Sequence, residues 1–294
     1  MDPEMSNIIL MDGKSLSESL ISKYIYIENT NKPKLVVITV GEDPASKIYI
    51  NNKIKACKKC NIDIIHKEYN LSISRNTLIR IIKNYNSDDS ITGILIQQPL
   101  PKALQGIEQY VEPKKDVDGF TYENIGKSLY GNTDKDLIAC TPKGIITLLD
   151  FYKVPLESKK VCILGRSNIV GKPLIGLLLA RNCTVISCNS YTQDLYNHTL
   201  NADIIISAMG KPKFIGPEYI GRNCICLIDV GINRDESGNL CGDFNTESII
   251  KAFKQYESNL KRYITPVPKG VGPMTIASLI QNINIAYNNQ ILGG

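Results

Sequence analysis

A lysine, a tyrosine and a serine are spaced to share one face of a predicted helix. The helix begins at Asp43-Pro44, a pair typical of a helix N-terminus. Ser46, Tyr49 and Lys53 then follow at positions i, i+3 and i+7. A lysine amine that is partly removed from water beside a neutral amide can exchange protons near neutral pH. A polar helix face is usually only solvated, so a catalytic interpretation requires partners for Lys53.

Two polar residues are candidates for such partners. Gln97 directly follows an apolar strand-like segment, residues 93–96, and therefore lies at the carboxyl edge where parallel sheets bind ligands. Asp118 lies in the dense loop sequence Lys115-Asp116-Val117-Asp118-Gly119-Phe120. Asp-Gly pairs are common turn formers, but in a cleft a carboxylate can accept paired hydrogen bonds from an amidine-like ring edge.

A second group of residues indicates a dinucleotide site. A strand-like segment leads into Gly165-Arg166-Ser167, and Gly171 opens a helix whose N-terminal N–H groups would face a pyrophosphate. The spacing is not G-x-G-x-x-G, so a purely structural glycine turn is the alternative. The next strand ends in Cys188-Asn189-Ser190-Tyr191, without the carboxylate that holds the ribose hydroxyls in NAD-binding units. Because Arg166 can supply a cation for a 2′-phosphate, the sequence favours NADP over NAD.

The elements that would position these residues alternate along the chain. Strand-like and helical patterns follow one another over residues 35–96 and again over residues 160–256. Residues 113–136 carry few apolar side chains and are predicted to be a loop. This alternation predicts an α/β protein with two α/β domains and a cleft between them, the second of the Rossmann type.

The composition excludes several classes of protein. The chain has 294 residues, a net charge of +5 and 43% hydrophobic residues, which is typical of a globular protein. Its apolar runs are far shorter than the ~20 residues of a membrane span, and its first residues do not resemble a signal peptide. Nine scattered cysteines indicate reduced thiols in a cytoplasmic protein. We expect no membrane association, no nucleic-acid binding and, with two histidines, no metal site.

Six ordered motifs, spread over about residues 13–287, are together similar to those of the bifunctional methylenetetrahydrofolate dehydrogenase/cyclohydrolase family. The motifs are Gly41-x-Asp43-Pro44-Ala45-Ser46-x-x-Tyr49-x-x-x-Lys53, Gln97-x-Pro99-Leu100-Pro101, Lys115-Asp116-Val117-Asp118-Gly119-Phe120, Cys140-Thr141-Pro142-x-Gly144, Gly165-Arg166-Ser167-x-x-Val170-Gly171-x-Pro173 and Thr265-Pro266-Val267-Pro268-x-Gly270-Val271-Gly272-Pro273-Met274-Thr275.

The resemblance implies an enzyme that oxidises 5,10-methylenetetrahydrofolate with NADP⁺ and then hydrolyses the 5,10-methenyl product to 10-formyltetrahydrofolate. By the same resemblance, Lys53 assists proton movement in the hydrolysis and Gln97 orients it. Tyr49 stacks on the aromatic rings of the folate, and Asp118 holds the pterin. The resemblance further implies substrate contacts at Pro268 and Gly272, and cofactor contacts at Gly165, Arg166, Ser167, Ser190 and Ile232.

The resemblance also implies a homodimer and the extent of each domain. The catalytic domain would comprise residues 1–143 with the C-terminal helix 274–294 returning to it, and the NADP-binding domain residues 144–273. The chain departs from the family pattern at Thr121, where histidine is frequent, at Gln98, which replaces an apolar residue, and at Lys269, which replaces glycine. Asn189 replaces a usual histidine and Tyr191 a usual basic residue, so a possible phosphate partner is lost.

These departures leave two alternatives to the bifunctional enzyme. One is a dehydrogenase of the same fold that lacks useful cyclohydrolase activity or prefers NAD. The other is a non-catalytic protein that binds folate or a nucleotide.

Overall fold

The computed structural model describes residues 7–26, 32–41, 44–255 and 260–291, with only the backbone of residues 44–46. The predicted N-cap Asp43 and the side chain of Ser46 therefore lie outside the described residues. Contacts within the chain define two compact units. The six-stranded unit comprises Met1–Leu16, Leu129–Gly131 and Thr141–Thr275, and the three-stranded unit comprises Ser17–Ser128, Asn132–Cys140 and Ile276–Gly294. Each unit has a parallel sheet with helices, so the predicted α/β class is confirmed.

The three-stranded unit is built on a parallel sheet in the order β3-β2-β4. The strands are β2 (Lys34–Val40), β3 (Asp63–Tyr69) and β4 (Gly93–Ile96), and the helices between them are α2 (Pro44–Lys59) and α3 (Arg75–Asn86). The alternation of strands and helices that the sequence predicts over residues 35–96 is thus confirmed.

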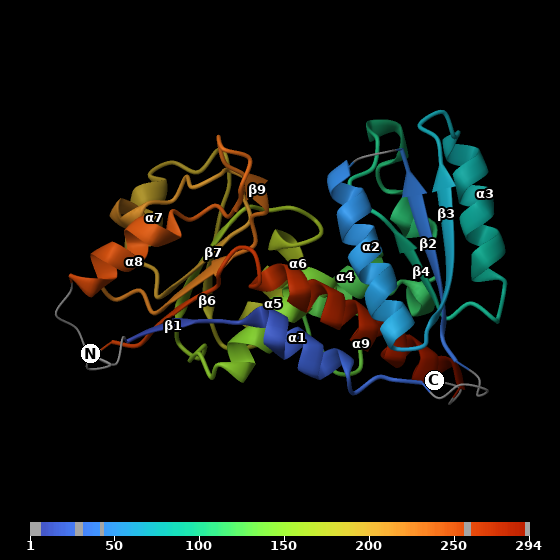
Figure 1. Ribbon diagram of the computed structural model, residues 1–294, viewed down its shortest axis with the longest axis horizontal. Helices are drawn as coiled ribbons and strands as arrows, with labels where there is room; N and C mark the ends of the chain where they lie inside the picture. Colours follow the sequence, from blue (N-terminus) through green and yellow to red (C-terminus); the bar gives the residue numbers. More distant parts are fainter. Residues whose placement is uncertain (1–6, 27–31, 42–43, 256–259, 292–294) are drawn as a thin grey trace. The chain divides into compact units, whose positions relative to one another are not determined.

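The apolar sequence of β2 is explained by burial on both faces of the sheet. Leu35 and Val37 pack in one hydrophobic cluster with residues of α2, whereas Val36 and Ile38 pack in another with residues of α3. Successive side chains of a strand point to opposite faces, so a central parallel strand must be apolar throughout. The two helices accordingly lie on opposite sides of the sheet (Figure 1).

The predicted loop over residues 113–136 is partly helical, so that expectation was wrong there. It contains a short 3₁₀ turn at Pro113–Lys115 and helix α4 at Tyr122–Ser128. Two further 3₁₀ turns, Lys102–Leu104 and Ile107–Tyr110, precede it. The α4 segment is short and carries little apolar periodicity, and therefore gave no helical signal.

The six-stranded unit has an all-parallel sheet in the order β1-β11-β8-β7-β5-β6. Its strands are β1 (Ile8–Leu10), β5 (Lys160–Leu164), β6 (Thr184–Cys188), β7 (Ile204–Ser207), β8 (Cys226–Asp229) and β11 (Arg262–Ile264). The chain order reverses between β5 and β7, and ligands bind at such switch points beyond the carboxyl ends of the strands. The predicted second α/β series is thus confirmed, and its glycine turn lies at this position.

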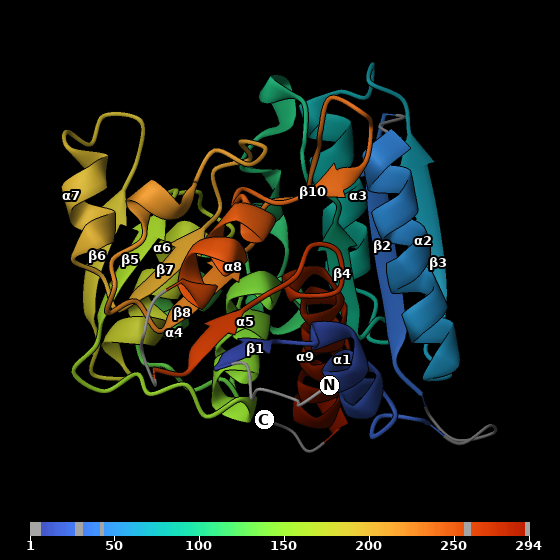
Figure 2. The ribbon, with the colours of Figure 1, turned by 60° about the vertical axis from the view of Figure 1, so that its left-hand side comes forward.

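Helices pack on this second sheet as well (Figure 2). Ile249 and Phe253 of α8 (Thr246–Lys254) pack with Ile205 and Leu227 of the sheet. The remaining elements are α1 (Gly13–Ile21), α5 (Cys140–Phe151), α6 (Gly171–Leu179), α7 (Leu195–Leu200), the 3₁₀ turn Pro217–Tyr219, the β9–β10 hairpin (Asn233–Arg234 and Leu240–Cys241) and α9 (Val271–Ile291).

The boundary between the units differs from the expected division at the N-terminus. Strand β1 pairs with β11, so the residues up to Leu16 group with the six-stranded unit, although the sequence analysis assigns residues 1–143 to the first domain. Both strands have three residues and no readable pattern. From Ile276 onward, α9 belongs to the three-stranded unit, where Ile280 and Ile283 pack with Leu35.

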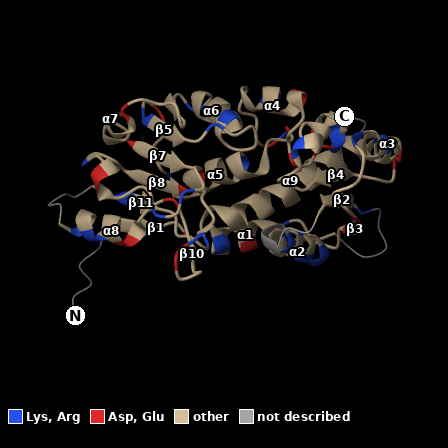
Figure 3. Cartoon of the chain, turned by 90° about the horizontal axis from the view of Figure 1, so that it is seen from above, with Lys and Arg blue, Asp and Glu red and all other residues tan. Residues whose placement is uncertain are grey.

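The surface charge is distributed over many elements. Basic residues are prominent on α2, and acidic residues are interspersed elsewhere along the chain (Figure 3). Across the described residues, no helix has both the length and the apolar character that a transmembrane span needs.

Candidate active site

Four predicted site residues come together in the three-stranded unit. Helix α2 carries Tyr49 and Lys53, Gln97 follows β4, and Asp118 comes from the loop before α4. The Lys53 Nζ donates a hydrogen bond to Gln97 Oε1 at 3.2 Å and lies 3.9 Å from Asp118 Oδ1. It also lies 5.3 Å from the centre of the Tyr49 ring. The helix, the strand end and the loop thus converge on one amine.

Within this cluster, Lys53 and Asp118 are almost entirely withdrawn from water, whereas Tyr49 and Gln97 are partly buried. Lys53 is 5% exposed and Asp118 is 6% exposed. Burial raises the pKa of Asp118 above its ordinary value, while the ammonium of Lys53 and a hydrogen bond with Cys140 act in the opposite direction. Because each of the two charges would be costly alone, the ion pair depends on both partners. Such a pair can hold or release a proton when a ligand changes its surroundings.

Gln97 is held by the sheet and by its own neighbour. Its backbone N–H donates to the carbonyl of Ile38, which continues the β4–β2 pairing, and its Nε2 donates to the carbonyl of Gln98 at 2.6 Å. The side-chain oxygen is therefore directed toward Lys53. A small cavity of about 30 Å³ adjoins Gln97 and is lined also by Thr39 and Glu68. This volume is large enough for a water molecule.

The loop that carries Asp118 is fixed by a neighbouring carboxylate. Asp116 is 3% exposed and accepts hydrogen bonds from the backbone N–H groups of Gly119 and Thr121 and from Asn124 Nδ2. Burial raises the pKa of Asp116, and these hydrogen bonds oppose that effect. Asp116 belongs to one of the six motifs, but no function was predicted for it. The structure shows that it organises the turn beside the catalytic candidates.

Two further buried residues hold the same loop. Lys115 donates to the carbonyls of Asn86 and Asp88, at the end of α3, where the helix dipole favours a cation. Asn282 of α9 is fully buried and donates to the carbonyls of Val117 and Ile138 at 2.9 and 2.7 Å. Sequence analysis missed Asn282, although a polar residue within an apolar helix was an available signal.

In the predicted glycine turn of the six-stranded unit, backbone segments approach one another so closely that a side chain would not fit. Gly165 has φ +119°, and a Cβ there would lie 2.6 Å from the carbonyl oxygen of Ala208. A Cβ on Gly171, the first residue of α6, would overlap the carbonyl oxygen of Gly165. Only glycine therefore fits at either position.

The surroundings of this turn fit a dinucleotide that carries a 2′-phosphate. The N-terminus of α6 offers N–H groups next to the turn, and Ser167 Oγ accepts from the N–H of Val170. The end of β6 carries the exposed Ser190 and no carboxylate. Arg166 is exposed, and within the described part of the chain its guanidinium makes no ion pair.

The other predicted ligand contacts lie in the six-stranded unit. Ile232 is 59% exposed, and its Cδ1 would be 3.8 Å from a Cβ on Gly272. Pro268 is exposed in the loop before α9. All of the cofactor candidates, together with Pro268 and Gly272, belong to this unit, whereas Tyr49, Lys53, Gln97 and Asp118 belong to the three-stranded unit.

Two buried carboxylates support the strand ends of the six-stranded unit and were missed by sequence analysis. Asp243 accepts hydrogen bonds from Ser207 Oγ and from the N–H groups of Met209 and Lys211. Asp229 accepts from the N–H groups of Gly231 and Asp243. Burial raises the pKa of Asp229 to about 6. These carboxylates therefore hold the loops that follow β7 and β8.

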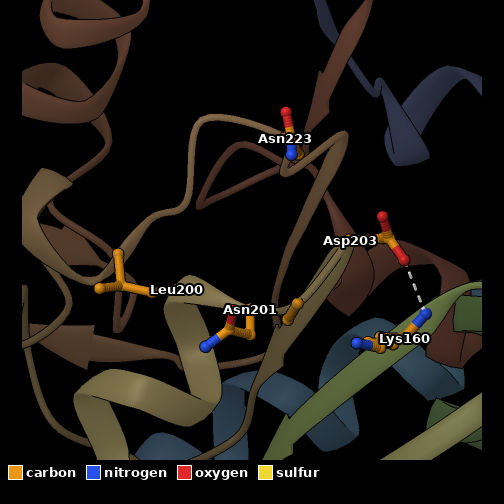
Figure 4. Close-up of a pocket in the computed structure, with 6 residues that line it drawn as sticks. Lys160, Leu200, Asn201, Asp203 and Asn223 are labelled. Atoms are coloured by element: carbon orange, nitrogen blue, oxygen red, sulfur yellow. Dashed lines mark hydrogen bonds between the residues drawn. The ribbon is translucent and has the colours of Figure 1, made fainter.

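A larger cavity of about 280 Å³ lies at the opposite, amino-terminal edge of this sheet (Figure 4). It is lined by Lys160, Asn201, Asp203 and Asn223, and Asp203 Oδ2 accepts the N–H of Lys160. It contains none of the predicted site residues. Within the described ranges, no group of three His, Cys, Asp or Glu residues is arranged to hold a metal ion.

Comparison with known proteins covers most of the chain. Residues 11–118 match the tetrahydrofolate dehydrogenase/cyclohydrolase catalytic domain, and residues 139–291 match the NAD(P)-binding domain of the same family. The bifunctional protein FolD of Chlorobium limicola is 41% identical, over 94% of this chain and 96% of that protein.

Two solved structures are similar over nearly their whole length. The bifunctional FolD methylenetetrahydrofolate dehydrogenase/cyclohydrolase of Campylobacter jejuni is 38% identical with a TM-score of 0.85, covering 96% of this chain and 99% of that one. The methylenetetrahydrofolate dehydrogenase-cyclohydrolase of Trypanosoma brucei, in complex with NADP and an inhibitor, is 27% identical with a TM-score of 0.86, covering 97% and 98%. The chain therefore belongs to the bifunctional tetrahydrofolate dehydrogenase/cyclohydrolase family, with an NAD(P)-binding domain.

Proposed function

We propose that this protein oxidises 5,10-methylenetetrahydrofolate with NADP⁺ to the 5,10-methenyl cation and hydrolyses that cation to 10-formyltetrahydrofolate. The observation that carries the proposal is the buried contact of Lys53 with Gln97 and Asp118. The folate binds to the three-stranded unit and the dinucleotide to the six-stranded unit. We infer that residues 1–143 with helix 274–294 form the catalytic part, except for the segment up to Leu16, which groups with the six-stranded unit, and that residues 144–273 form the NADP-binding part.

Lys53 accepts and donates protons in the hydrolytic step. Water adds to the electron-poor carbon and loses both of its protons on the way to the formyl C=O. A ring nitrogen gains one proton as the ring opens, so one proton is released overall. A single amine beside the reacting carbon can serve both transfers. Gln97 keeps the Nζ of Lys53 in place by accepting its hydrogen bond, and the small cavity beside Gln97 provides room for a water molecule.

Asp118 and Tyr49 hold the folate. The Asp118 carboxylate accepts paired hydrogen bonds from the pterin ring, and Tyr49 supplies an aromatic surface for ring stacking. Binding of the pterin also shields the Lys53–Asp118 pair from bulk water. Pro268, in the loop before α9, and Gly272, in the first turn of α9, contribute further substrate contacts.

The dinucleotide is held at the carboxyl edge of the six-stranded sheet. Gly165 allows close approach to the phosphates, Ile232 contacts the cofactor, and Arg166, Ser167 and Ser190 bind the phosphate groups. Bound NADP⁺ supplies the hydride acceptor. The absence of a carboxylate from residues 188–193 and the NADP complex of the Trypanosoma brucei relative support NADP as the cofactor. Hydride loss then depends mainly on positioning.

The protein is further proposed to be a cytoplasmic homodimer. All nine cysteines are free and buried, which suits a reducing compartment. The dimer is implied by the family resemblance, and sedimentation of the purified chain would test it.

A two-product assay tests the proposal. The purified chain is mixed with 5,10-methylenetetrahydrofolate and either NADP⁺ or NAD⁺, while reduced nicotinamide and the methenyl absorbance are followed separately. The bifunctional enzyme produces reduced nicotinamide without lasting methenyl accumulation. Accumulation of the methenyl product would indicate a dehydrogenase without useful cyclohydrolase activity, and absence of both signals would contradict the proposal.

A further inference from the structure

We propose that Tyr191 is a specificity-determining residue that holds the Arg166 guanidinium in place for the 2′-phosphate of NADP. The inference rests on the proposed NADP-dependent function and deepens it. Tyr191 directly follows Ser190, just after the end of β6. The structure assigns it an indirect way of contributing to phosphate recognition, through a neighbouring cation.

The strand register brings Arg166 and Tyr191 to the same sheet edge. Leu164 of β5 is paired with Cys188 of β6, and the N–H of Gly165 donates to the carbonyl of Cys188 at 2.9 Å. The residues that follow these two strands are therefore neighbours. The positive φ of Gly165 turns the chain at this point, so that Arg166 leaves β5 next to the β6 end.

The turn that carries Tyr191 is fixed by three hydrogen bonds. The N–H of Asn189 donates to Thr192 Oγ1 at 2.8 Å, and the N–H of Thr192 donates back to the carbonyl of Asn189 at 2.9 Å. Asn189 Oδ1 accepts the N–H of Tyr191 at 3.0 Å. Asn189 thus closes the turn, and Tyr191 projects from a defined backbone.

The Arg166 guanidinium lies beside an aromatic ring, and its N–H groups are available as hydrogen-bond donors. Its Cζ lies 5.7 Å from the centre of the Tyr191 ring. Within the described ranges, its guanidinium forms no hydrogen bond or ion pair in the protein. A cation–π contact of this kind leaves the N–H groups of the guanidinium available for a phosphate. Asp194, three residues after Tyr191, accepts a hydrogen bond from the N–H of Asn197 and does not pair with Arg166.

This arrangement favours the phosphorylated cofactor by restricting the arginine before binding. Tyr191 is 82% exposed, so the ring buries little apolar surface in the protein itself. An exposed cation–π contact corresponds to a roughly two- to fivefold change in affinity. Because the contact acts through Arg166, the effect falls on the dinucleotide that has a 2′-phosphate.

Equilibrium binding of NADP⁺ and NAD⁺ to the full chain, measured by calorimetry without folate, tests the proposal. Tyr191→Leu is expected to weaken NADP⁺ binding about two- to fivefold and to leave NAD⁺ binding unchanged. Tyr191→Phe, which keeps the ring, should bind both like the parent chain. Tyr130→Leu is the matched control, because Tyr130 is 85% exposed and is not a site candidate.

A double variant separates this inference from the function on which it rests. If Tyr191 acts through Arg166, then adding Tyr191→Leu to Arg166→Ala causes no further loss of NADP⁺ affinity. Additive losses, or equal losses for NADP⁺ and NAD⁺, would show that the ring stacks on the cofactor itself and would overturn the inference. If Arg166→Ala alone leaves the NADP⁺ preference unchanged, the phosphate role of Arg166 in the proposed function fails as well.

Discussion

The Nζ of Lys53 lies 3.9 Å from a carboxylate oxygen of Asp118, and the two side chains are only 6% and 9% exposed. A pair of this kind gains from mutual attraction what each charge loses by leaving water. It is therefore sensitive to any change that removes one partner. The two residues come from a helix and a loop more than 60 positions apart, so the loop must be held as firmly as the helix.

Lys53→Met should abolish the hydrolysis of the methenyl substrate while dinucleotide binding stays intact. Methionine preserves most of the volume of the lysine stem but cannot accept or donate a proton. The measurement is the decay of methenyl absorbance, corrected for the uncatalysed rate, together with NADP⁺ calorimetry. Lys55→Met is the control, because Lys55 is exposed on the same helix. Wild-type hydrolysis in the Lys53 variant would exclude the assigned role.

Asn282→Leu should destabilise the protein and weaken folate binding. The change removes the Nδ2 donor from the carbonyl of Ile138, while the Cys140 thiol remains a donor to the carbonyl of Val117. An unsatisfied buried carbonyl costs about 1–3 kcal/mol. Because the Val117 carbonyl adjoins Asp118, the folate KM should rise while the NADP⁺ KM stays constant. Asn288→Leu, at an exposed position of α9, provides the control in urea denaturation.

Gly171→Ala should weaken NADP⁺ binding and lower stability by about 1–3 kcal/mol, the usual cost of overpacking. The added methyl group would collide with the Gly165 carbonyl, and a backbone atom cannot rotate away. Gly126→Ala is the matched control, since a Cβ there meets no atom within 4 Å. That change, inside α4, should raise stability by about 0.5–1 kcal/mol. Equal behaviour of the two variants in thermal unfolding and calorimetry would contradict the assigned packing.

Asp229 should make the protein less stable as the pH rises from 4 to 7. Its pKa is raised from 3.8 to about 6 in the folded protein, so the folded state retains a proton that the unfolded chain releases. The stabilising contribution is complete below pH 4 and is lost as the pH passes 6. The pKa difference corresponds to about 3 kcal/mol.

Urea denaturation of the parent chain and of Asp229→Asn at pH 4 and pH 7 provides the measurement. The amide does not titrate, so the stability difference between parent and variant should shrink by about 2 kcal/mol across this range. A difference that stays constant with pH would refute the raised pKa. The hydrogen bonds lost in the variant affect both pH values alike and cancel in the comparison.

Much of the fold was predictable because its central strands are buried on both faces. The central residues of β2 (35–38) and of β7 (204–206) are all apolar, and both strands lie where the sequence predicts alternating strands and helices. The helix start at Gly171 follows from the glycine turn. By contrast, β1 and β11 have three residues each, and only pairing with distant parts of the chain makes them strands.

The candidate active site likewise contains residues that local sequence patterns predict and residues that only distant contacts bring together. Lys53 and Gln97 were expected together because helical spacing and the carboxyl edge of a strand are local features. The supports of the Asp118 loop were missed because they depend on contacts between distant residues. Asn282 lies 165 positions beyond Val117, whose carbonyl it binds. The cation–π contact between Arg166 and Tyr191 was not predicted either, because it depends on the register of β5 and β6, which the sequence pattern does not give.

The last helix has a consequence for the order in which the protein matures during translation. Ile280 and Ile283 complete the core around Leu35 and Ile50, so the three-stranded unit lacks part of its interior until the end of the chain has left the ribosome. The three-stranded unit is thus synthesised early for the most part but can complete its core only at the end of translation. A nascent chain halted before residue 276 should expose the side of β2 that carries Leu35 and Val37, and chaperones bind exposed apolar surfaces of this kind.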